Sequence, residues 1–137
     1  MSGYLRITAG PYIFKAEQEE AAPLTCEAFR GRLPLRNRII HVRWSGEAVW
    51  VPLGETKIVA DYENHTIFPS RGDVLLYPGG ISETEILIAY GATSFASKTG
   101  TLAGNHFLTI VEGMENLVAL GQLVLWEGAQ NILFEAI

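Results

Sequence analysis

Two glutamates are the first residues in this sequence whose type and spacing could do chemistry. Glu83 and Glu85 lie two residues apart, just before the apolar run Ile86, Leu87 and Ile88. In an extended strand, residues two apart point to the same side, about 7 Å from each other. Two carboxylates at that spacing repel, and burial raises the pKa of at least one of them. Such a pair can supply a general acid and a general base or ligands for a hard cation, whereas the alternative is a solvated strand end.

Two Asn-His dipeptides form a second group. Asn64-His65 and Asn105-His106 each follow a loop-like stretch and precede a possible strand. Histidine titrates near neutral pH and is the commonest metal ligand in proteins. No HxH, HxxxH or paired-cysteine spacing occurs in the chain, so we predict neither a metal nor another cofactor. Hydrogen-bonded structural histidines are the alternative to catalytic or ligand-binding ones.

The phrase Tyr77-Pro78-Gly79-Gly80 directly precedes the acidic pair. Its glycines allow positive φ or a close approach of the backbone. A ligand anion could meet the N–H groups of such a loop, and a plain β-turn is the alternative.

Charge and composition limit the kinds of partner. The 137 residues suit one domain over 1–137, and the net charge is −5. Five arginines and no acid lie between residues 30 and 43, which leaves five basic against fifteen acidic residues elsewhere. This acidic excess argues against nucleic acid as a partner, although the arginines could bind an anion locally. The single Cys26, no signal-peptide pattern and no apolar run of about 20 residues predict a cytoplasmic protein with no membrane partner.

Short alternating runs separated by Gly, Pro and Asn predict a mainly β protein. Two segments have helical character, 23–30 with Leu24, Ala28 and Phe29 as its buried stripe, and 113–121 ending at Gly121. With this many short strands, a closed β-barrel with two short α-helices removes unpaired edges. The strands are expected at 4–8, 11–17, 38–44, 47–53, 56–61, 73–77, 85–90, 93–97, 106–112, 122–126 and 131–136.

Several phrases, in this order, resemble the cyclophilin fold. They are Ala22-Pro23-Leu24-Thr25 with Phe29-Arg30, Asn37-Arg38-Ile39-Ile40, and Glu112-Gly113-Met114-Glu115. The resemblance implies that Arg38 stands where cyclophilins carry their catalytic arginine. The Phe-x-x-Gln-Gly-Gly run of prolyl isomerases does not follow it.

A closer resemblance is to a family of small bacterial cyclophilin-like proteins of unknown function. The phrases that carry it are Pro69-Ser70-Arg71-Gly72-Asp73, Leu76-Tyr77-Pro78-Gly79-Gly80, Ser82-Glu83-Thr84-Glu85, Phe95-Ala96-Ser97-Lys98 and Leu102-Ala103-Gly104-Asn105-His106-Phe107. This resemblance implies a cyclophilin-like barrel and no established reaction.

Three hypotheses for function follow. The first is a pocket at the barrel rim that binds, and in a stronger version converts, a small polar metabolite. Its alternatives are a divergent peptidyl-prolyl isomerase and a non-catalytic oligomeric scaffold or subunit. The mean hydropathy of +0.18 leads us to expect at least a weakly held homodimer. For the pocket we predict catalytic roles for Glu83, Glu85 and His106, and ligand-binding roles for Arg38, His65, Asn105 and Tyr77.

Overall fold

The structure, a computed structural model, describes residues 3–137 and is built around eight long strands. Two helices accompany them, α1 (Pro23–Arg30) and α2 (Leu117–Glu127), and a 3-10 turn over Met114–Asn116 leads into α2. Three two-residue strands complete the described secondary structure, namely β5 (His65–Thr66), β8 (Ala96–Ser97) and β9 (Gly100–Thr101). The long strands are β1 (Tyr4–Ala9), β2 (Tyr12–Gln18), β3 (Leu35–His41), β4 (Gly46–Gly54), β6 (Asp73–Tyr77), β7 (Thr84–Thr93), β10 (Gly104–Glu112) and β11 (Gln130–Ala136).

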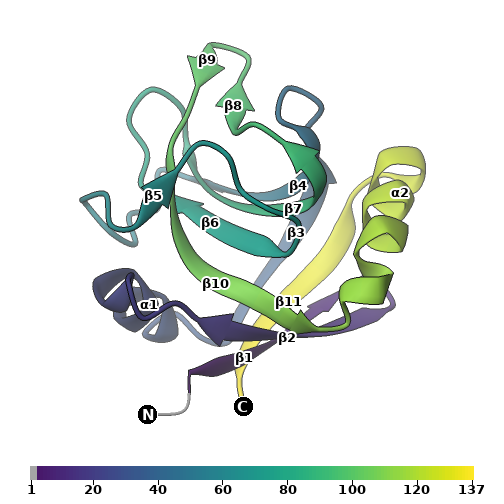
Figure 1. The fold of residues 1–137 in the computed structure, drawn as a ribbon, viewed down its shortest axis with the longest axis horizontal. Coiled ribbons are helices and arrows are strands. Elements are labelled where there is room, and N and C mark those ends of the chain that lie inside the picture. The colour runs from purple at the N-terminus through teal and green to yellow at the C-terminus, as the bar shows by residue number, and fades with distance from the viewer. Residues whose placement is uncertain (1–2) are drawn as a thin grey trace.

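These strands form a closed antiparallel barrel. Their order is β2-β1-β11-β3-β4-β7-β6-β10, and β10 pairs in turn with β2, so the sheet returns to its first strand (Figure 1). The short β5 adds to β10, and β8 pairs with β9 as a separate hairpin. The prediction of a closed, cyclophilin-like β-barrel with two short helices is therefore confirmed.

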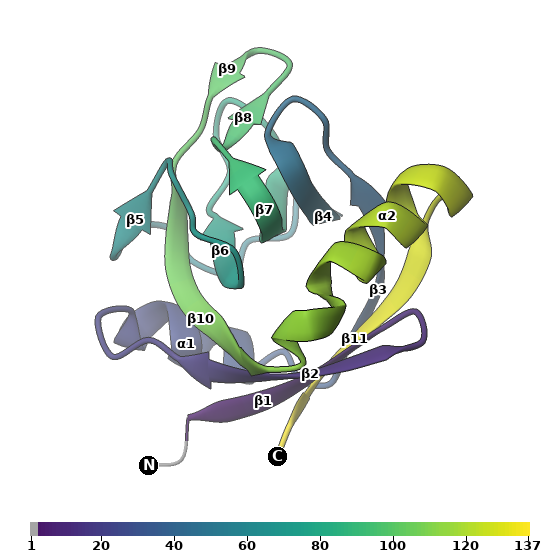
Figure 2. The ribbon, with the colours of Figure 1, turned by 45° about the vertical axis from the view of Figure 1, so that its right-hand side comes forward.

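Alternation along the strands separates an inner from an outer apolar cluster. The inner core fills the barrel and includes Ile86, Ile88 and Tyr90 of β7 together with buried residues of both helices. Figure 2 shows α1 near one end of the barrel and α2 along its other side. The outer apolar cluster lies on the outside of β4, β6 and β7, under the segment that contains β8 and β9. Its members are Val42, Ala48, Leu75, Tyr77, Leu87, Phe95 and Leu102, with Trp50 packed against them.

Two predicted strands were wrong, and a third, 93–97, is divided between the end of β7 and β8. The segment 56–61 forms no strand. Hydrogen bonds hold Lys57 of this segment in an irregular conformation, since its carbonyl accepts from Arg32 and its Nζ donates to Pro78 O at 3.0 Å. The segment 122–126 is part of α2, which runs through Gly121 to Glu127 instead of ending at Gly121. Its valines and leucines favour a strand locally, but four residues at helical spacing pack on the barrel core and fix the helix. These are Leu117, Leu120, Gly121 and Val124.

The limits of α1 and the burial of Phe29 are as predicted, but Ala28 of the predicted stripe is only half-buried and Leu24 is exposed. Thr25, Cys26 and Phe29 are buried, whereas Leu24 is 69% exposed. The backbone N–H and the hydroxyl of Thr25 both donate to the Glu63 carboxylate, which fixes the first turn of the helix. In this orientation Leu24 points outward. No helix among residues 3–137 is long and apolar enough to cross a membrane.

Candidate functional site

Glu85 is a buried acid without a hydrogen-bond partner. Leu87 on β7 belongs to the outer apolar cluster, and Glu85 lies two residues before it, so Glu85 also faces outward. Pro52 and Tyr77 lie opposite Glu85 on the two neighbouring strands. The residue is 4% exposed, and its carboxyl makes no hydrogen bond to any described residue. Burial, and then the negative charge of Glu83, raise the pKa of Glu85 to about 8. At neutral pH this side chain is therefore a neutral acid that can donate a proton or a hydrogen bond.

Glu83 sits in the turn before β7 and is exposed. Its carboxylate accepts a hydrogen bond of 3.2 Å from the N–H of Gly54, at the end of β4. The same turn is held by the Tyr77 hydroxyl, which accepts the N–H groups of Ile81 and Ser82 at 3.1 and 3.3 Å. Thus Glu83, Glu85 and Tyr77, three of the predicted site residues, lie at one end of β6 and β7.

Arg38 lies on the same outer face. It precedes Ile40 by two residues on β3, and Ile40 pairs with Trp50 of the outer apolar cluster. Extending this register by two residues sets Arg38 beside Pro52, the strand neighbour of Glu85. Arg38 is exposed, and no described acid lies within ion-pair distance of it.

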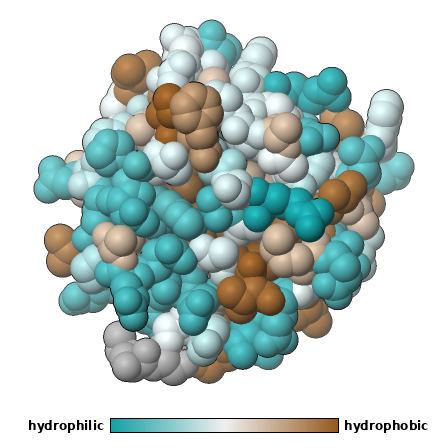
Figure 3. All heavy atoms as spheres, viewed as in Figure 1, coloured by the Kyte–Doolittle hydropathy of each residue, from teal (hydrophilic) through white to brown (hydrophobic). Residues whose placement is uncertain are grey.

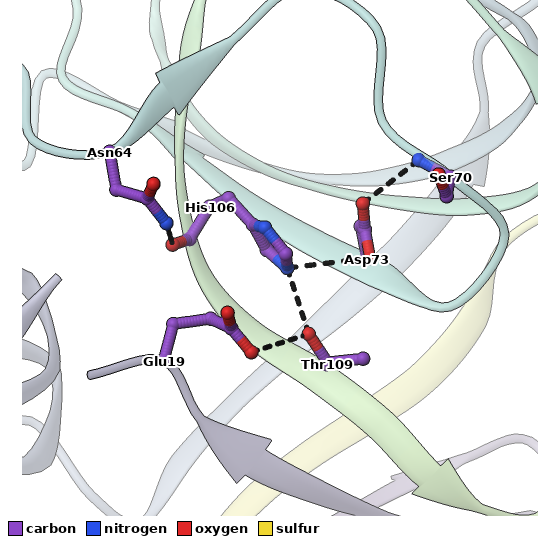
Figure 4. A network of polar contacts seen from close by, with 6 residues as sticks. All are labelled: Glu19, Asn64, Ser70, Asp73, His106 and Thr109. Carbon is purple, nitrogen blue, oxygen red and sulfur yellow. Dashed lines mark hydrogen bonds and ion pairs between the residues drawn. The ribbon is translucent and has the colours of Figure 1, made fainter. Parts of the chain in front are cut away.

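His106 belongs to a separate network (Figure 4). Its Nε2 is 2.8 Å from the Thr109 hydroxyl and 3.3 Å from Asp73 Oδ1. The Thr109 hydroxyl donates to Glu19 at 2.7 Å, so its oxygen is left to accept from Nε2–H. The network therefore fixes the hydrogen of this ring on Nε2 and leaves Nδ1 as the nitrogen without a described partner.

A β-bulge creates this network. The register of β10 against β6 shifts between His106 and Leu108, so Phe107 is an extra residue that points into the inner core. In a regular strand, residues 106 and 109 would point to opposite faces. The extra residue brings His106 and Thr109 to the same outer face, beside Asp73. The sequence contains no turn residue that marks this bulge, which is why Asp73, Thr109 and Glu19 were not predicted as partners of His106.

Asn105 and His65 lie on the α1 side of β10. The Asn105 amide donates to Thr25 Oγ1 and to Asp61 O, both at 3.1 Å, and its oxygen accepts from Glu63 N at 3.0 Å. Both N–H groups of the Asn105 side chain thus donate to other residues of the protein. His65 is exposed on β5, with its ring 4.9 Å from that of Tyr62.

The predicted site residues therefore do not converge in one pocket. His106 is opposite Leu75, which is opposite Leu87, and Glu85 is two residues further along β7. Two strand spacings and two residues separate the backbones of His106 and Glu85 by about 12 Å. Leu75 and Tyr77 lie between them, and Phe95 packs on Tyr77 with ring centroids 6.0 Å apart.

A surface hollow of about 900 Å³ lies on another part of the molecule, between β2 and α1. Four glutamates line it, and Glu19 of the His106 network is one of them. None of the polar groups in its wall is both deeply buried and unpartnered, since the buried Cys26 thiol donates to Phe107 O at 3.2 Å. Among residues 3–137, no group of three or more His, Cys, Asp or Glu side chains is arranged to hold a metal ion.

Comparison with known proteins gives a family and two similar folds. Residues 6–136 match the family model described as "Protein of unknown function (DUF3830)". No curated protein matches the chain. The solution structure of the hypothetical protein AF2241 from Archaeoglobus fulgidus is similar, with a TM-score of 0.68 and 22% identity over 99% of this chain and 95% of that one.

The second similar fold is that of McbB in complex with tryptophan. It has a TM-score of 0.62 and 17% identity over 96% of this chain, which spans 44% of McbB. At these identities, both likenesses concern the fold alone. The family match confirms the prediction of a family of unknown function, and the barrel described above fits a cyclophilin-like fold, whereas the bacterial origin stays a prediction.

Proposed function

The chain belongs to the DUF3830 family of proteins of unknown function, and we propose its function from its own side chains. The outer barrel face around Glu85 binds a small polar molecule, and the Glu85 carboxyl donates a hydrogen bond or a proton to it. Tyr77 and Glu83 shape this site through the turn that precedes β7. The reaction, if the bound molecule is converted, is a proton transfer in which Glu85 is the general acid.

The observation that carries this proposal is that the largely buried Glu85 has no hydrogen bond from any described residue, although its carboxyl oxygens are not fully enclosed. An acid in this position can meet a molecule at the surface without first breaking a contact inside the protein. A carboxyl that only stabilised the fold would gain by having a partner, as Glu63 and Glu19 do. A ligand that accepts a hydrogen bond from Glu85 would supply the missing contact.

The His106 network supports a binding role less well, because most of its polar atoms already have partners. Asp73 Oδ2 accepts the N–H of Ser70 at 2.8 Å, while Glu19 and Thr109 bond to each other. We propose that this network joins the end of β2 to β6 and β10, and that its positions open to a ligand are His106 Nδ1 and the second carboxylate oxygen of Glu19. The catalytic role of His106 stays a prediction.

A ligand screen on matched variants tests the proposal. The melting temperature of the protein is measured with a panel of amino acids, hydroxy acids and dicarboxylates, including L-tryptophan, the molecule in the McbB complex. We expect a member of the panel to raise the melting temperature of the wild type, and Glu85→Met, which has a side chain of similar length but no hydrogen-bond donor, to abolish that rise. Glu83→Gln, which removes the neighbouring exposed acid, is expected to keep it. An equal response of the wild type and Glu85→Met to every panel member would refute the proposal.

A further inference from the structure

The arginines on β3 lack acidic partners. The ion pairs that arginine and lysine side chains make among the described residues involve Arg6 and Lys15, but neither Arg36 nor Arg38. Arg38 and Arg36 are both exposed and alternate with inward residues, so both extend from the outer face of the barrel. An exposed guanidinium with no acid beside it keeps its full hydrogen-bonding capacity for an anion.

Of these arginines, Arg38 stands in register with Glu85. The row across the outer face runs from Arg38 on β3 to Pro52 on β4 and Glu85 on β7. Two strand spacings separate the backbones of Arg38 and Glu85 by about 10 Å, with no polar side chain between them. A cation and a neutral acid therefore face the same stretch of surface from opposite sides.

The next row of side chains gives that surface an apolar floor. Ile40 pairs with Trp50, and Trp50 pairs with Leu87. Ile40 and Trp50 are only half-buried, so part of each remains open beside Arg38 and Pro52. An indole face of this kind favours flat or aliphatic carbon skeletons.

We propose, building on the function proposed above, that this face takes a small organic acid with an apolar or aromatic body. Its carboxylate pairs with Arg38, its body rests on Ile40 and Trp50, and a second polar atom accepts a hydrogen bond from Glu85. A carboxylate suits the site better than a phosphate. The exposed charge of Glu83 lies close enough to act on Glu85, and a dianion would meet more of that repulsion than a monoanion.

The test uses L-3-phenyllactate, which combines a carboxylate, a hydroxyl and an aromatic body. Binding is followed through the indole N–H signal of Trp50 in NMR titrations. Two comparison probes each lack one feature, L-3-phenyllactamide the charge and 3-phenylpropionate the hydroxyl. Inorganic phosphate is the anion control. We expect phenyllactate to shift the Trp50 signal and the amide and phosphate to leave it unchanged.

Variants on one strand separate Arg38 from general charge effects. Arg38→Gln is expected to weaken phenyllactate binding at least about tenfold, because it removes a charge-assisted hydrogen bond. Arg36→Gln is the matched control, since it removes the same charge from the same face of β3, and it should weaken binding less than about threefold. Glu85→Met, which removes the hydrogen-bond donor, should weaken binding of phenyllactate but not of phenylpropionate, which offers no hydroxyl.

The outcomes distinguish this inference from the function on which it rests. Equal effects of Arg38→Gln and Arg36→Gln, equal binding of the amide, or a shift of Trp50 by phosphate would each overturn the organic-acid inference. So would an unmoved Trp50 signal up to the solubility limit of phenyllactate. If the neutral amide binds equally and Glu85→Met weakens its binding, the proposed hydrogen-bonding role of Glu85 stands although the organic-acid inference fails. In the other cases the melting-temperature screen on Glu85→Met tests that role separately. If phenyllactate binds through Arg38 and Glu85→Met changes nothing, the role of Glu85 fails instead.

Discussion

At the scale of single residues, the neighbourhood of an acid determines whether it is available for chemistry. Glu63, Glu19 and Glu83 each accept hydrogen bonds from the protein, whereas Glu85 accepts none. Glu83 and Glu85 look equivalent in sequence, being acids two residues apart. The structure separates them, since one is exposed in a turn and the other is covered by the outer apolar cluster.

The raised pKa of Glu85 gives a testable dependence of stability on pH. The ordinary pKa is 4.5 and the folded one about 8, so between these values the folded protein keeps a proton that the unfolded chain loses. The free energy of unfolding therefore falls as pH rises, by up to about 1.4 kcal/mol per pH unit relative to Glu85→Gln. Urea denaturation of both proteins from pH 5 to pH 9 measures this difference.

Glu83→Gln is the matching control for that experiment. The charge of Glu83 contributes to the raised pKa of Glu85, so its removal should end the fall in stability at a lower pH. Parallel pH profiles of the wild type and Glu85→Gln would contradict the assignment of Glu85 as a neutral buried acid.

At the scale of elements, α1 depends on a residue far away in sequence. The Glu63 carboxylate accepts the N–H groups of Leu24 and Thr25 at 3.2 and 2.8 Å, and the Thr25 hydroxyl at 2.7 Å. Burial alone would raise the pKa of Glu63, but these hydrogen bonds lower it overall. Glu63 thus caps the N-terminus of α1, where an N-cap side chain from the preceding residue is missing.

Removing this cap should weaken the protein near neutral pH. Glu63→Gln is expected to lose about 1–2 kcal/mol of unfolding free energy. Because the folded pKa is lowered, the contribution exists above the ordinary value of 4.5 and disappears as pH falls, so the two proteins should converge in acid. Denaturation at pH 7 and pH 3 checks this, with the exposed Glu55→Gln as control. A loss that persists unchanged at pH 3 would argue against a charged cap.

The packing of α2 depends on a glycine in its middle. A Cβ on Gly121 would lie 2.5 Å from three ring atoms of Tyr90, so the helix backbone rests directly on that ring. Gly121→Ala should therefore destabilise the protein by about 1–3 kcal/mol, although alanine favours an isolated helix. Val118→Ala, on the 46% exposed side of the helix, is the control and should change stability little. Thermal unfolding of the two variants measures both changes in stability. A Gly121→Ala variant more stable than the wild type would show that α2 is not packed in this way.

At the scale of the whole molecule, the barrel is closed and offers few edges to a partner. Exposed large apolar side chains occur on several elements, for example Leu24, Phe68, Ile81 and Trp126. On the face shown in Figure 3, apolar side chains form separate spots among hydrophilic ones. Homo-oligomer formation, expected from the mean hydropathy, stays a prediction.

Light scattering over a range of concentrations tests that prediction. A weakly held homodimer should give a molar mass that rises above 15.1 kDa as concentration increases. Trp126→Glu, which puts a charge on a 75% exposed side chain of α2, should reduce the rise if α2 is part of the interface. A mass that stays at 15.1 kDa at all concentrations would refute self-association.

The sequence by itself determined the class of fold and most of the strands. Alternating apolar residues and turn glycines are local signals, so β6 and α1 were predicted with their limits. The segment 122–126 was wrong because Val and Leu suit a strand as well as a buried helix. Only contact with Tyr90 and the barrel core decides between the two.

The candidate site was decided by tertiary structure. The sequence identified Glu85 and Arg38, but their common row depends on the registers of β3, β4 and β7. The network of His106 likewise depends on a bulge at Phe107 that no local signal marks. Whether a polar side chain is buried, partnered or free depends on residues tens of positions away, because the strands that surround it are not neighbours in the chain. For that reason composition and periodicity predict a barrel, and only the packed barrel distinguishes the buried Glu85 from exposed acids such as Glu83.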